Sequence, residues 1–160
     1  MLKKALEQPE IALICQNIRS LHNVGSIFRT ADAYGIGKVY LCGYTGAPPR
    51  SEISKVALGA ESWVPWEKRH DTWRLIEELR DRGFQIAALE QNKNSVSITS
   101  FKPKYPMALI LGNEVKGVTK EILKRSDAVV HLPMYGKKES LNVSVAAGAA
   151  LAYLRYCLKK

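Results

Sequence analysis

The chain has 160 residues, the length of one domain, and 46% of them are apolar, which suffices for a core without disulfide or metal staples. Lysine and arginine number 24 against 15 aspartate and glutamate, which gives a formal net charge of +9. An enzyme of small metabolites does not need this excess, whereas a polyanionic partner such as nucleic acid explains it. A basic surface that only keeps the protein soluble is the alternative.

The cysteines and the first residues indicate where the protein works. Cys15, Cys42 and Cys157 are odd in number, lie in apolar stretches and lack a Cys-x-x-Cys spacing, which argues against a disulfide framework or a zinc site. The first ten residues hold no apolar segment typical of a secretory signal, and no apolar run reaches the length of a membrane span. We expect a cytoplasmic protein with no membrane partner.

The first half of the chain alternates short apolar runs with helical patterns. Val24, Ile27, Phe28 and Ala31 have the spacing of one buried helix face, while Pro65 weakens one apolar run to an edge strand or a loop. The expected elements, in chain order, are a strand at residues 11–15, a helix around 24–31, a strand at 38–42, a weaker strand at 62–66, and a helix that Asp71 caps and Gly83 ends.

The second half continues this alternation. The expected elements are strands at residues 84–89, 107–111 and 128–132, a long basic loop at 91–106, a short helix at 119–125, and a final helix at 141–158. The strands are continuous apolar runs, as in parallel strands covered on both faces. The sequence therefore predicts a single α/β domain over residues 1–160, built on a parallel sheet with helices on both faces.

The final helix is rich in small residues. Ala146, Ala147, Gly148, Ala149 and Ala150 place them on nearly every side, with valines and leucines beside them. A helix that is apolar all round is buried all round, which in so small a domain favours burial against a second subunit. We expect a homodimer, with packing between the sheet and a neighbouring helix as the alternative.

Polar blocks that contain glycine begin where three predicted strands end, and in parallel sheets such junctions bind ligands. They occupy residues 17–32, 111–117 and 132–147. In the first block, Gly25 permits close approach of a ligand or another chain. Arg29 is able to hold a phosphate through two hydrogen bonds, unless it pairs with Asp32 on the helix surface.

The other two blocks have their own candidate residues. Gly112 can expose its backbone to a ligand, and Glu114 either lies at the mouth of the sheet or complements a helix dipole. Lys137 and Lys138 belong to a basic loop. Ser140 is the expected N-cap of the final helix, and Asn142 would then lie inside that helix, where asparagine is unfavourable.

Motifs of several other ligand classes are missing. The sequence has no Gly-x-Gly-x-x-Gly, no P-loop, no His-Glu-x-x-His and no Ser-His-Asp order. His22, His70 and His131 have no metal-ligand spacing, and His131 is expected to be an interior histidine. We expect no dinucleotide, ATP or metal site.

From residue 11 onward, the three blocks resemble in order and spacing the SpoU (TrmH-like) family of the SPOUT RNA methyltransferases. The first block resembles the family's Asn-x-Gly-x-x-x-Arg-Thr-Ala-Asp, and the second its Leu-Gly-Asn-Glu-x-x-Gly. The third resembles its Ile-Pro-Met-x-Gly followed by Ser-Leu-Asn-Val-Ser-Val-Ala, which is highly specific.

The resemblance implies a parallel sheet with a C-terminal trefoil knot, one of the rare exceptions to unknotted folds, and a homodimer. It also implies S-adenosylmethionine bound in a bent form in the knot, between the turns that follow three strands. The implied cofactor contacts are Leu89, Gly112, Leu132, Met134, Ser140 and Leu141.

The implied reaction is methyl transfer from S-adenosylmethionine to a ribose 2′-hydroxyl of RNA. The residues that match the family's functional positions are Asn23, Arg29, Glu114, Ser140 and Asn142. A ribose hydroxyl is a poor nucleophile, so the site must align it and stabilise developing negative charge. The arginine of this motif is often assigned the base role. Because a guanidinium gives up its proton reluctantly, we expect Arg29 to clamp a phosphate and stabilise charge, with Asn142 and Ser140 orienting it or the ribose.

We expect no separate RNA-binding domain, so RNA recognition falls to the methyltransferase domain or to an accessory RNA-binding partner. The candidate RNA-binding residues are Arg19, Arg29, Arg50, Lys137 and Lys138, with Lys3, Lys4, Lys55, Lys159 and Lys160 as further candidates. Transfer RNA is the first expectation for the substrate and ribosomal RNA the second. Base methylation and a catalytically silent RNA-binding role are the alternative functions.

Overall fold

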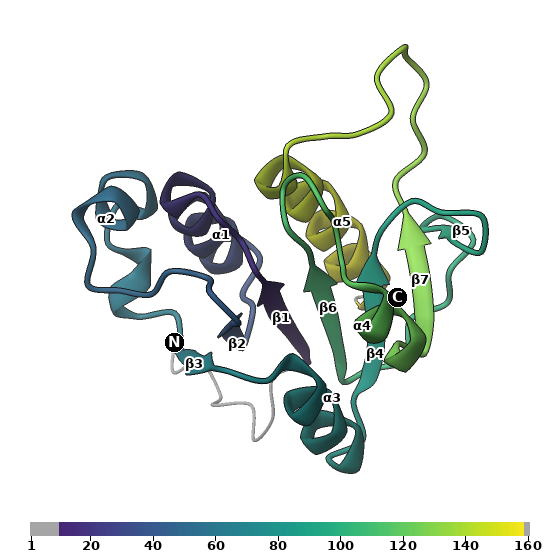
Figure 1. The fold of residues 1–160 in the computed structure, drawn as a ribbon, viewed down its shortest axis with the longest axis horizontal. Coiled ribbons are helices and arrows are strands. Elements are labelled where there is room, and N and C mark those ends of the chain that lie inside the picture. Colours follow the sequence, from purple (N-terminus) through teal and green to yellow (C-terminus); the bar gives the residue numbers. More distant parts are fainter. Residues whose placement is uncertain (1–9, 159–160) are drawn as a thin grey trace.

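A computed structural model describes residues 10–158 (Figure 1). Its strands are β1 (Ile11–Gln16), β2 (Lys38–Cys42), β3 (Trp66–Arg69), β4 (Gln85–Leu89), β5 (Val96–Ser97), β6 (Met107–Leu111) and β7 (Ala128–His131). Its helices are α1 (Leu21–Ala33), α2 (Ser51–Ala57), the 3-10 helix η1 (Ala60–Ser62), α3 (Thr72–Asp81), α4 (Lys120–Arg125) and α5 (Val143–Leu158).

The strands form one parallel sheet in the order β3-β2-β1-β6-β4-β7-β5. The most apolar strands, β1 and β6, lie side by side and are buried along their length. Because every strand runs the same way, the segments that follow them gather at one edge. This edge brings the three polar blocks together. The predicted single α/β domain with a parallel sheet is confirmed, and the trefoil knot stays a prediction.

Helices cover both faces of the sheet (Figure 1). Alternate side chains of β1 face opposite ways, so that Leu13 packs with Phe28 and Leu151 in one hydrophobic cluster and Ile14 packs with Ile76 in the other. The first cluster lies under α1, α2 and α5, and the second lies under α3 and α4. Both faces are therefore apolar, which explains why the strands have no polar alternation.

Three elements, α2, η1 and β5, were not predicted, and one strand lies later in the chain than expected. Helix α2 buries only Ile53 and Ala57, which is too few for a helical period to show, and β5 has two residues within the predicted loop. The weaker strand expected at 62–66 is instead β3, which starts at Trp66. It lies at the edge of the sheet beside β2, the position that the nearby proline had suggested.

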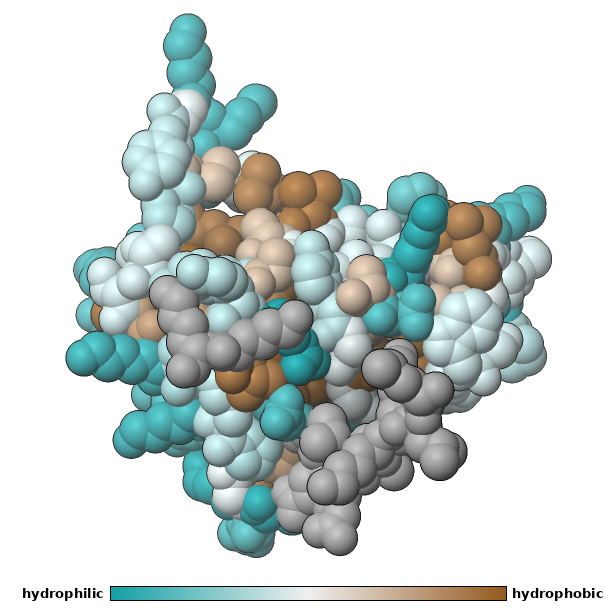
Figure 2. All heavy atoms as spheres, turned by 180° about the vertical axis from the view of Figure 1, so that it is seen from behind, coloured by the Kyte–Doolittle hydropathy of each residue, from teal (hydrophilic) through white to brown (hydrophobic). Residues whose placement is uncertain are grey.

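Helix α5 is buried on one side only within this chain. Ala147, Ala150 and Leu151 are buried, whereas Val145 is 56% exposed. Figure 2 shows hydrophobic spheres at the surface beside the protruding segment, residues 132–142 between β7 and α5. Leu141 at the end of this segment and Val145 in the first turn of α5 are exposed. Among residues 10–158, no helix combines the length and apolarity needed to cross a membrane.

Gly25 makes its close approach to another helix of the same chain. A Cβ atom built on it would lie 2.5 Å from the carbonyl oxygen of Ile53 and 3.0 Å from Cβ of Val56. The lack of a side chain thus lets α1 pack against α2, whose backbone cannot easily move aside. The expectation that Gly25 approaches a ligand or a second chain is corrected to this helix contact.

We predict that Gly25→Ala destabilises the fold by overpacking the contact between α1 and α2. Overpacking of this kind costs about 1–3 kcal/mol, which lowers Tm by roughly 2–12 °C in a chain of this length. Differential scanning calorimetry measures the change. Gly136→Ala is the matched control, because its Cβ would meet no atom within 4 Å. Equal Tm values for both variants would contradict the packing role of Gly25.

Candidate functional site

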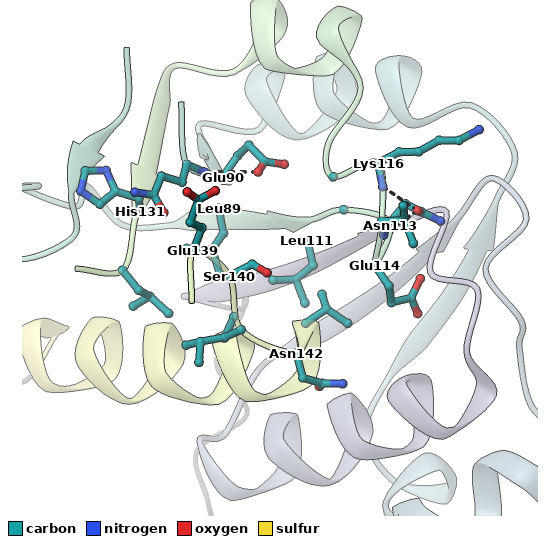
Figure 3. A pocket seen from close by; sticks show the side chains of 18 of the residues that line it. Leu89, Glu90, Leu111, Asn113, Glu114, Lys116, His131, Glu139, Ser140 and Asn142 are labelled. Carbon is teal, nitrogen blue, oxygen red and sulfur yellow. Dashed lines mark hydrogen bonds between the residues drawn. The ribbon is translucent and has the colours of Figure 1, made fainter. Parts of the chain in front are cut away.

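A cavity of about 860 Å³ opens where β4, β6 and β7 end (Figure 3). This volume is in the range of small-molecule sites, about 300–1,000 Å³. Its walls come from the turns after the three strands and from the start of α5. The six residues expected to contact a cofactor all line it: Leu89, Gly112, Leu132, Met134, Ser140 and Leu141.

The lining combines apolar side chains with carboxylates. Leu89, Leu132 and Met134 provide apolar surface, and Glu90 and Glu139 bring carboxylates to the same cavity (Figure 3). Such a cavity suits a ligand with a flat apolar part and a positive charge. Among residues 10–158, no group of three or more His, Cys, Asp or Glu side chains is arranged to hold a metal ion.

The turn after β6 is closed so tightly that only glycine fits at its start. A Cβ on Gly112 would lie 2.3 Å from the backbone of both Gly117 and Val118. Glu90 closes the turn from outside, because its Oε2 accepts the N–H of Val118 at 2.8 Å. Gly112 lines the cavity, but its lack of a side chain is required by the turn itself rather than by a ligand.

Glu114 joins the second block to the first. Its carboxylate accepts the N–H groups of Arg19 and Ser20, each at 2.9 Å, and the side-chain amide of Asn23 at 3.0 Å. Burial by itself raises the pKa of the Glu114 carboxyl, but these hydrogen bonds outweigh it, so that the net pKa lies below the usual range. The group is therefore an anion at neutral pH and orders the start of α1.

Asn142 joins the third block to the first. Its Nδ2 donates to Oδ1 of Asn23 at 3.2 Å, and its Oδ1 accepts the N–H of Ser144 at 2.9 Å. Helix α5 starts at Val143, so Asn142 caps it. The expectation that Ser140 is the cap and that Asn142 lies inside the helix is wrong, because Ser140 and Leu141 are not helical and line the cavity.

Arg29 is the one predicted catalytic residue that lies apart. Asn23, Glu114, Ser140 and Asn142 border the cavity or bond to its lining. Arg29 is exposed on α1, six residues and about 9 Å along the helix axis from Asn23. It lines no part of the cavity, and within residues 10–158 its guanidinium makes no hydrogen bond or ion pair.

The sequence offered Arg29 an alternative partner, Asp32, but Asp32 contacts another residue in the structure. Oδ1 of Asp32 accepts the indole N–H of Trp63 at 2.6 Å. No Arg29–Asp32 ion pair forms in the described part of the chain. Arg29 is therefore exposed on the α1 surface without a partner among the described residues.

The candidate RNA-binding residues do not form one patch. Arg19 lies beside the turn that carries Glu114, and Lys137 and Lys138 lie on the exposed protruding segment. Arg50 precedes α2 and lies 3.8 Å from Glu52. Among the further candidates, Lys55 is exposed on α2, and Lys3, Lys4, Lys159 and Lys160 lie outside the described residues.

Sequence reasoning missed the role of Asn113. Its Nδ2 donates to the carbonyl of Asn17 at 3.0 Å and to the hydroxyl of Tyr44 at 2.8 Å. Its Oδ1 accepts the N–H groups of Val115 and Lys116, both at 2.9 Å. The signal was present, since Asn113 follows a predicted strand and asparagines are frequent in turns.

His131 is also placed differently from its expectation. It lines the cavity and is only partly buried, and its Nδ1 lies 2.9 Å from the hydroxyl of Ser95. The prediction that His131 is an interior residue of an apolar strand is therefore wrong.

The thiols of Cys15 and Cys42 are buried and free, and burial raises the pKa of Cys42 to about 11. Neither provides a thiolate nucleophile.

Comparison with known proteins identifies relatives over nearly the whole chain. The model of the SpoU rRNA Methylase family matches residues 10–152. A tRNA (guanosine(18)-2'-O)-methyltransferase of Aquifex aeolicus is 36% identical over 153 residues, which are 94% of this chain and 72% of that protein. Its namesake in Escherichia coli is 32% identical over 147 residues, 92% of this chain and 63% of that protein.

A solved structure shows the same fold. The crystal structure of an AdoMet-bound rRNA methyltransferase from Sinorhizobium meliloti superposes with a TM-score of 0.88 at 29% identity. The match covers 94% of this chain and 58% of that one. The chain thus spans somewhat more than half of this neighbour and less than two thirds of the E. coli relative.

We predict that Glu114→Gln lowers stability in a pH-dependent way. A carboxyl whose pKa is lowered by folding stabilises the fold above its unfolded pKa, and this stabilisation is lost as pH falls through the folded value. At pH 7 we expect Tm to fall by roughly 2–4 °C, since a hydrogen-bonded carboxylate at a partly exposed site is worth about 1 kcal/mol. The difference from wild type narrows as pH drops below the ordinary value of 4.5.

Thermal melting from pH 3 to pH 8 measures this difference. Glu139→Gln is the matched control, because it removes the same charge from an exposed side chain that makes no hydrogen bond or ion pair within residues 10–158. A difference that stays constant across the pH range would contradict the role given to the Glu114 carboxylate.

Proposed function

The chain belongs to the SpoU rRNA methylase family, and from this membership and its cavity we propose that it transfers a methyl group from S-adenosylmethionine to a ribose 2′-hydroxyl of RNA. The observation that supports this most strongly is the linkage Glu114–Asn23–Asn142. It ties together the three blocks that carry the family resemblance, and the second and third of them line one cavity.

The residues of the cavity fit S-adenosylmethionine. Leu89, Leu132 and Met134 suit the adenine ring, and the backbone of the surrounding turns suits its polar edge. The carboxylates of Glu90 and Glu139 suit the positive charge of a sulfonium. When bound, the cofactor supplies an electrophilic methyl group. The related structure from Sinorhizobium meliloti contains AdoMet.

The neighbouring polar residues position the ribose. Ser140 lies on the non-helical segment that borders the cavity, where its hydroxyl is able to bond the ribose. The two ends of the Asn142 amide are engaged by Asn23 and by the start of α5, so Asn142 holds this segment in place. Glu114 does the same for the start of α1.

Arg29 acts, in this proposal, from a second subunit. Its guanidinium is exposed and lies outside the cavity of its own chain, yet α1 packs against α5. The exposed Leu141 lines that cavity just before α5, and Val145 is exposed in the first turn of α5. A homodimer that covers the apolar surface of α5 brings Arg29 of one protomer to the cavity of its partner. There it clamps a phosphate and stabilises charge rather than removing a proton.

We propose tRNA as the substrate class, in a protein that works in the cytoplasm. The curated relatives from Aquifex aeolicus and Escherichia coli are tRNA methyltransferases. The net charge of +9 supports a polyanionic substrate, and the free cysteines Cys15, Cys42 and Cys157 support a reducing compartment. The basic residues of the domain itself supply RNA binding, with an accessory partner as the alternative.

We predict that the purified protein labels a 2′-O-methylnucleoside. Unmodified bulk tRNA and rRNA are incubated with S-adenosylmethionine that carries an isotopic methyl label, and the digested RNA is analysed by nucleoside mass spectrometry. Label on a base would instead establish base methylation. Absence of label, with S-adenosylmethionine still bound in calorimetry, would indicate an accessory partner or a silent RNA-binding role.

We predict that two inactive variants complement each other. In dimers mixed from Arg29→Ala and Glu114→Ala chains, one of the two sites takes both intact residues, one from each chain. A random mixture therefore recovers about a quarter of wild-type activity. Each variant alone is expected to lose about 100-fold. Co-expression with two affinity tags isolates the mixed dimer, and light scattering gives its mass. No recovery would contradict the shared site.

A further inference from the structure

A second hollow lies on the other side of the turn that carries Glu114. Its volume is about 760 Å³, and seven residues line it: Arg19, Ser20, Tyr44, Asn113, Glu114, Val115 and Lys116. Residues 113–116 border both this hollow and the cofactor cavity, so that one turn separates them. Figure 3 shows the Lys116 side chain pointing away from the cofactor cavity.

Tyr44 presents a flat aromatic surface in this hollow. It is 61% exposed, which is a large fraction for an aromatic side chain, yet hydrogen bonds hold both its hydroxyl and its backbone N–H. Its hydroxyl accepts the amide of Asn113 at 2.8 Å, and its N–H donates to Oδ1 of Asn17 at 3.3 Å. An aromatic ring that is both held and exposed is a stacking surface prepared before any ligand binds.

The charges around Tyr44 favour a phosphate. The side chains of Arg19 and Lys116 are exposed and make no ion pair within residues 10–158. The facing carboxylate of Glu114 is already engaged by two backbone N–H groups and the Asn23 amide. Two cations without an ion pair in the same hollow as an exposed ring match a nucleotide, which has a base to stack and a phosphate to bind.

We propose that this hollow binds a nucleotide of the substrate RNA next to the methylated one, with its base stacked on Tyr44 and its phosphate between Arg19 and Lys116. The proposal rests on the function proposed above and extends it to substrate selection. The shared wall places this nucleotide beside the reacting ribose. Tyr44 thereby helps to choose the RNA and to present the target nucleotide, while the cofactor is held on the other side of the turn.

The test compares the binding of unmodified bulk tRNA by four proteins: wild type, Tyr44→Ala, Tyr44→Phe and Trp63→Ala. Trp63 is the matched control, because it is 60% exposed and lines neither hollow. Filter binding gives Kd for tRNA, steady-state methyl transfer gives KM and kcat, and calorimetry gives Kd for S-adenosylmethionine.

We expect Tyr44→Ala to weaken tRNA binding roughly 5- to 100-fold, the loss that one stacked base typically causes. KM for tRNA rises in parallel, while Kd for S-adenosylmethionine stays unchanged. Tyr44→Phe and Trp63→Ala remain within about twofold of wild type, since stacking needs the ring and not the hydroxyl. Tyr44→Leu, which keeps apolar bulk without a flat ring, behaves like Tyr44→Ala and checks the result in a second variant.

The salt dependence of binding separates stacking from charge. Arg19→Ala and Lys116→Ala are each expected to reduce the slope of log Kd against log salt by about one, and Tyr44→Ala leaves that slope unchanged. The inference is overturned if Tyr44→Ala binds tRNA as wild type does. It is equally overturned if Tyr44→Phe loses as much as Tyr44→Ala, because the hydroxyl bond to Asn113 would then be the only contribution.

The outcomes also separate this inference from the proposed function. Binding of tRNA that depends on Tyr44 in a protein without methyl transfer would keep the nucleotide site and reject the reaction. Methyl transfer to ribose that is indifferent to Tyr44→Ala would keep the reaction and reject the nucleotide site.

Discussion

The carboxylate of Glu114 is the point on which the geometry of the site depends. It collects three donors from the start of α1, and the Asn23 amide that it holds accepts in turn from Asn142. These partners are 91 to 119 residues apart in the chain, so the bonds hold three distant segments at one edge of the sheet. An anion is suited to this role, because hydrogen bonds to a charged acceptor are stronger than those between neutral groups.

The parallel sheet determines where this network forms. With β1 and β6 buried at its centre, the turns after β1, β4, β6 and β7 open at the same edge, where polar groups remain accessible. The tight turn from Gly112 to Gly117 then divides that edge into two hollows. One is rich in apolar and acidic groups and suits a cationic cofactor. The other carries an aromatic ring and two free cations and suits a nucleotide.

The distribution of charge agrees with this division. Several basic residues of α3, α4 and β3 form ion pairs, for example Arg69 with Glu78 and Arg80 with Asp127. Arg19, Arg29, Lys116 and the lysines of the protruding segment have no such partner within residues 10–158. Within residues 10–158, basic side chains without an ion pair thus border the two hollows, while others, such as Lys102 and Lys120, lie elsewhere on the surface.

The sequence by itself determined the strands, most helices, the parallel α/β fold and the three blocks that surround the cavity. These follow from local properties: continuous apolar runs, a helical period in α1, and a specific order of polar residues after strands. The six residues that the family resemblance implied as cofactor contacts all line the cavity.

Only the tertiary structure decided which partners these residues meet. Gly25 meets α2, Asn142 rather than Ser140 caps α5, Arg29 lies outside its own cavity, and the exposed Tyr44 is held by Asn113. Each depends on a contact with a residue far away in the chain or on how the segment before it is oriented. Periodicity and composition report the burial of a residue, but not the atom that its polar groups reach, because that atom is brought near only when the sheet has formed.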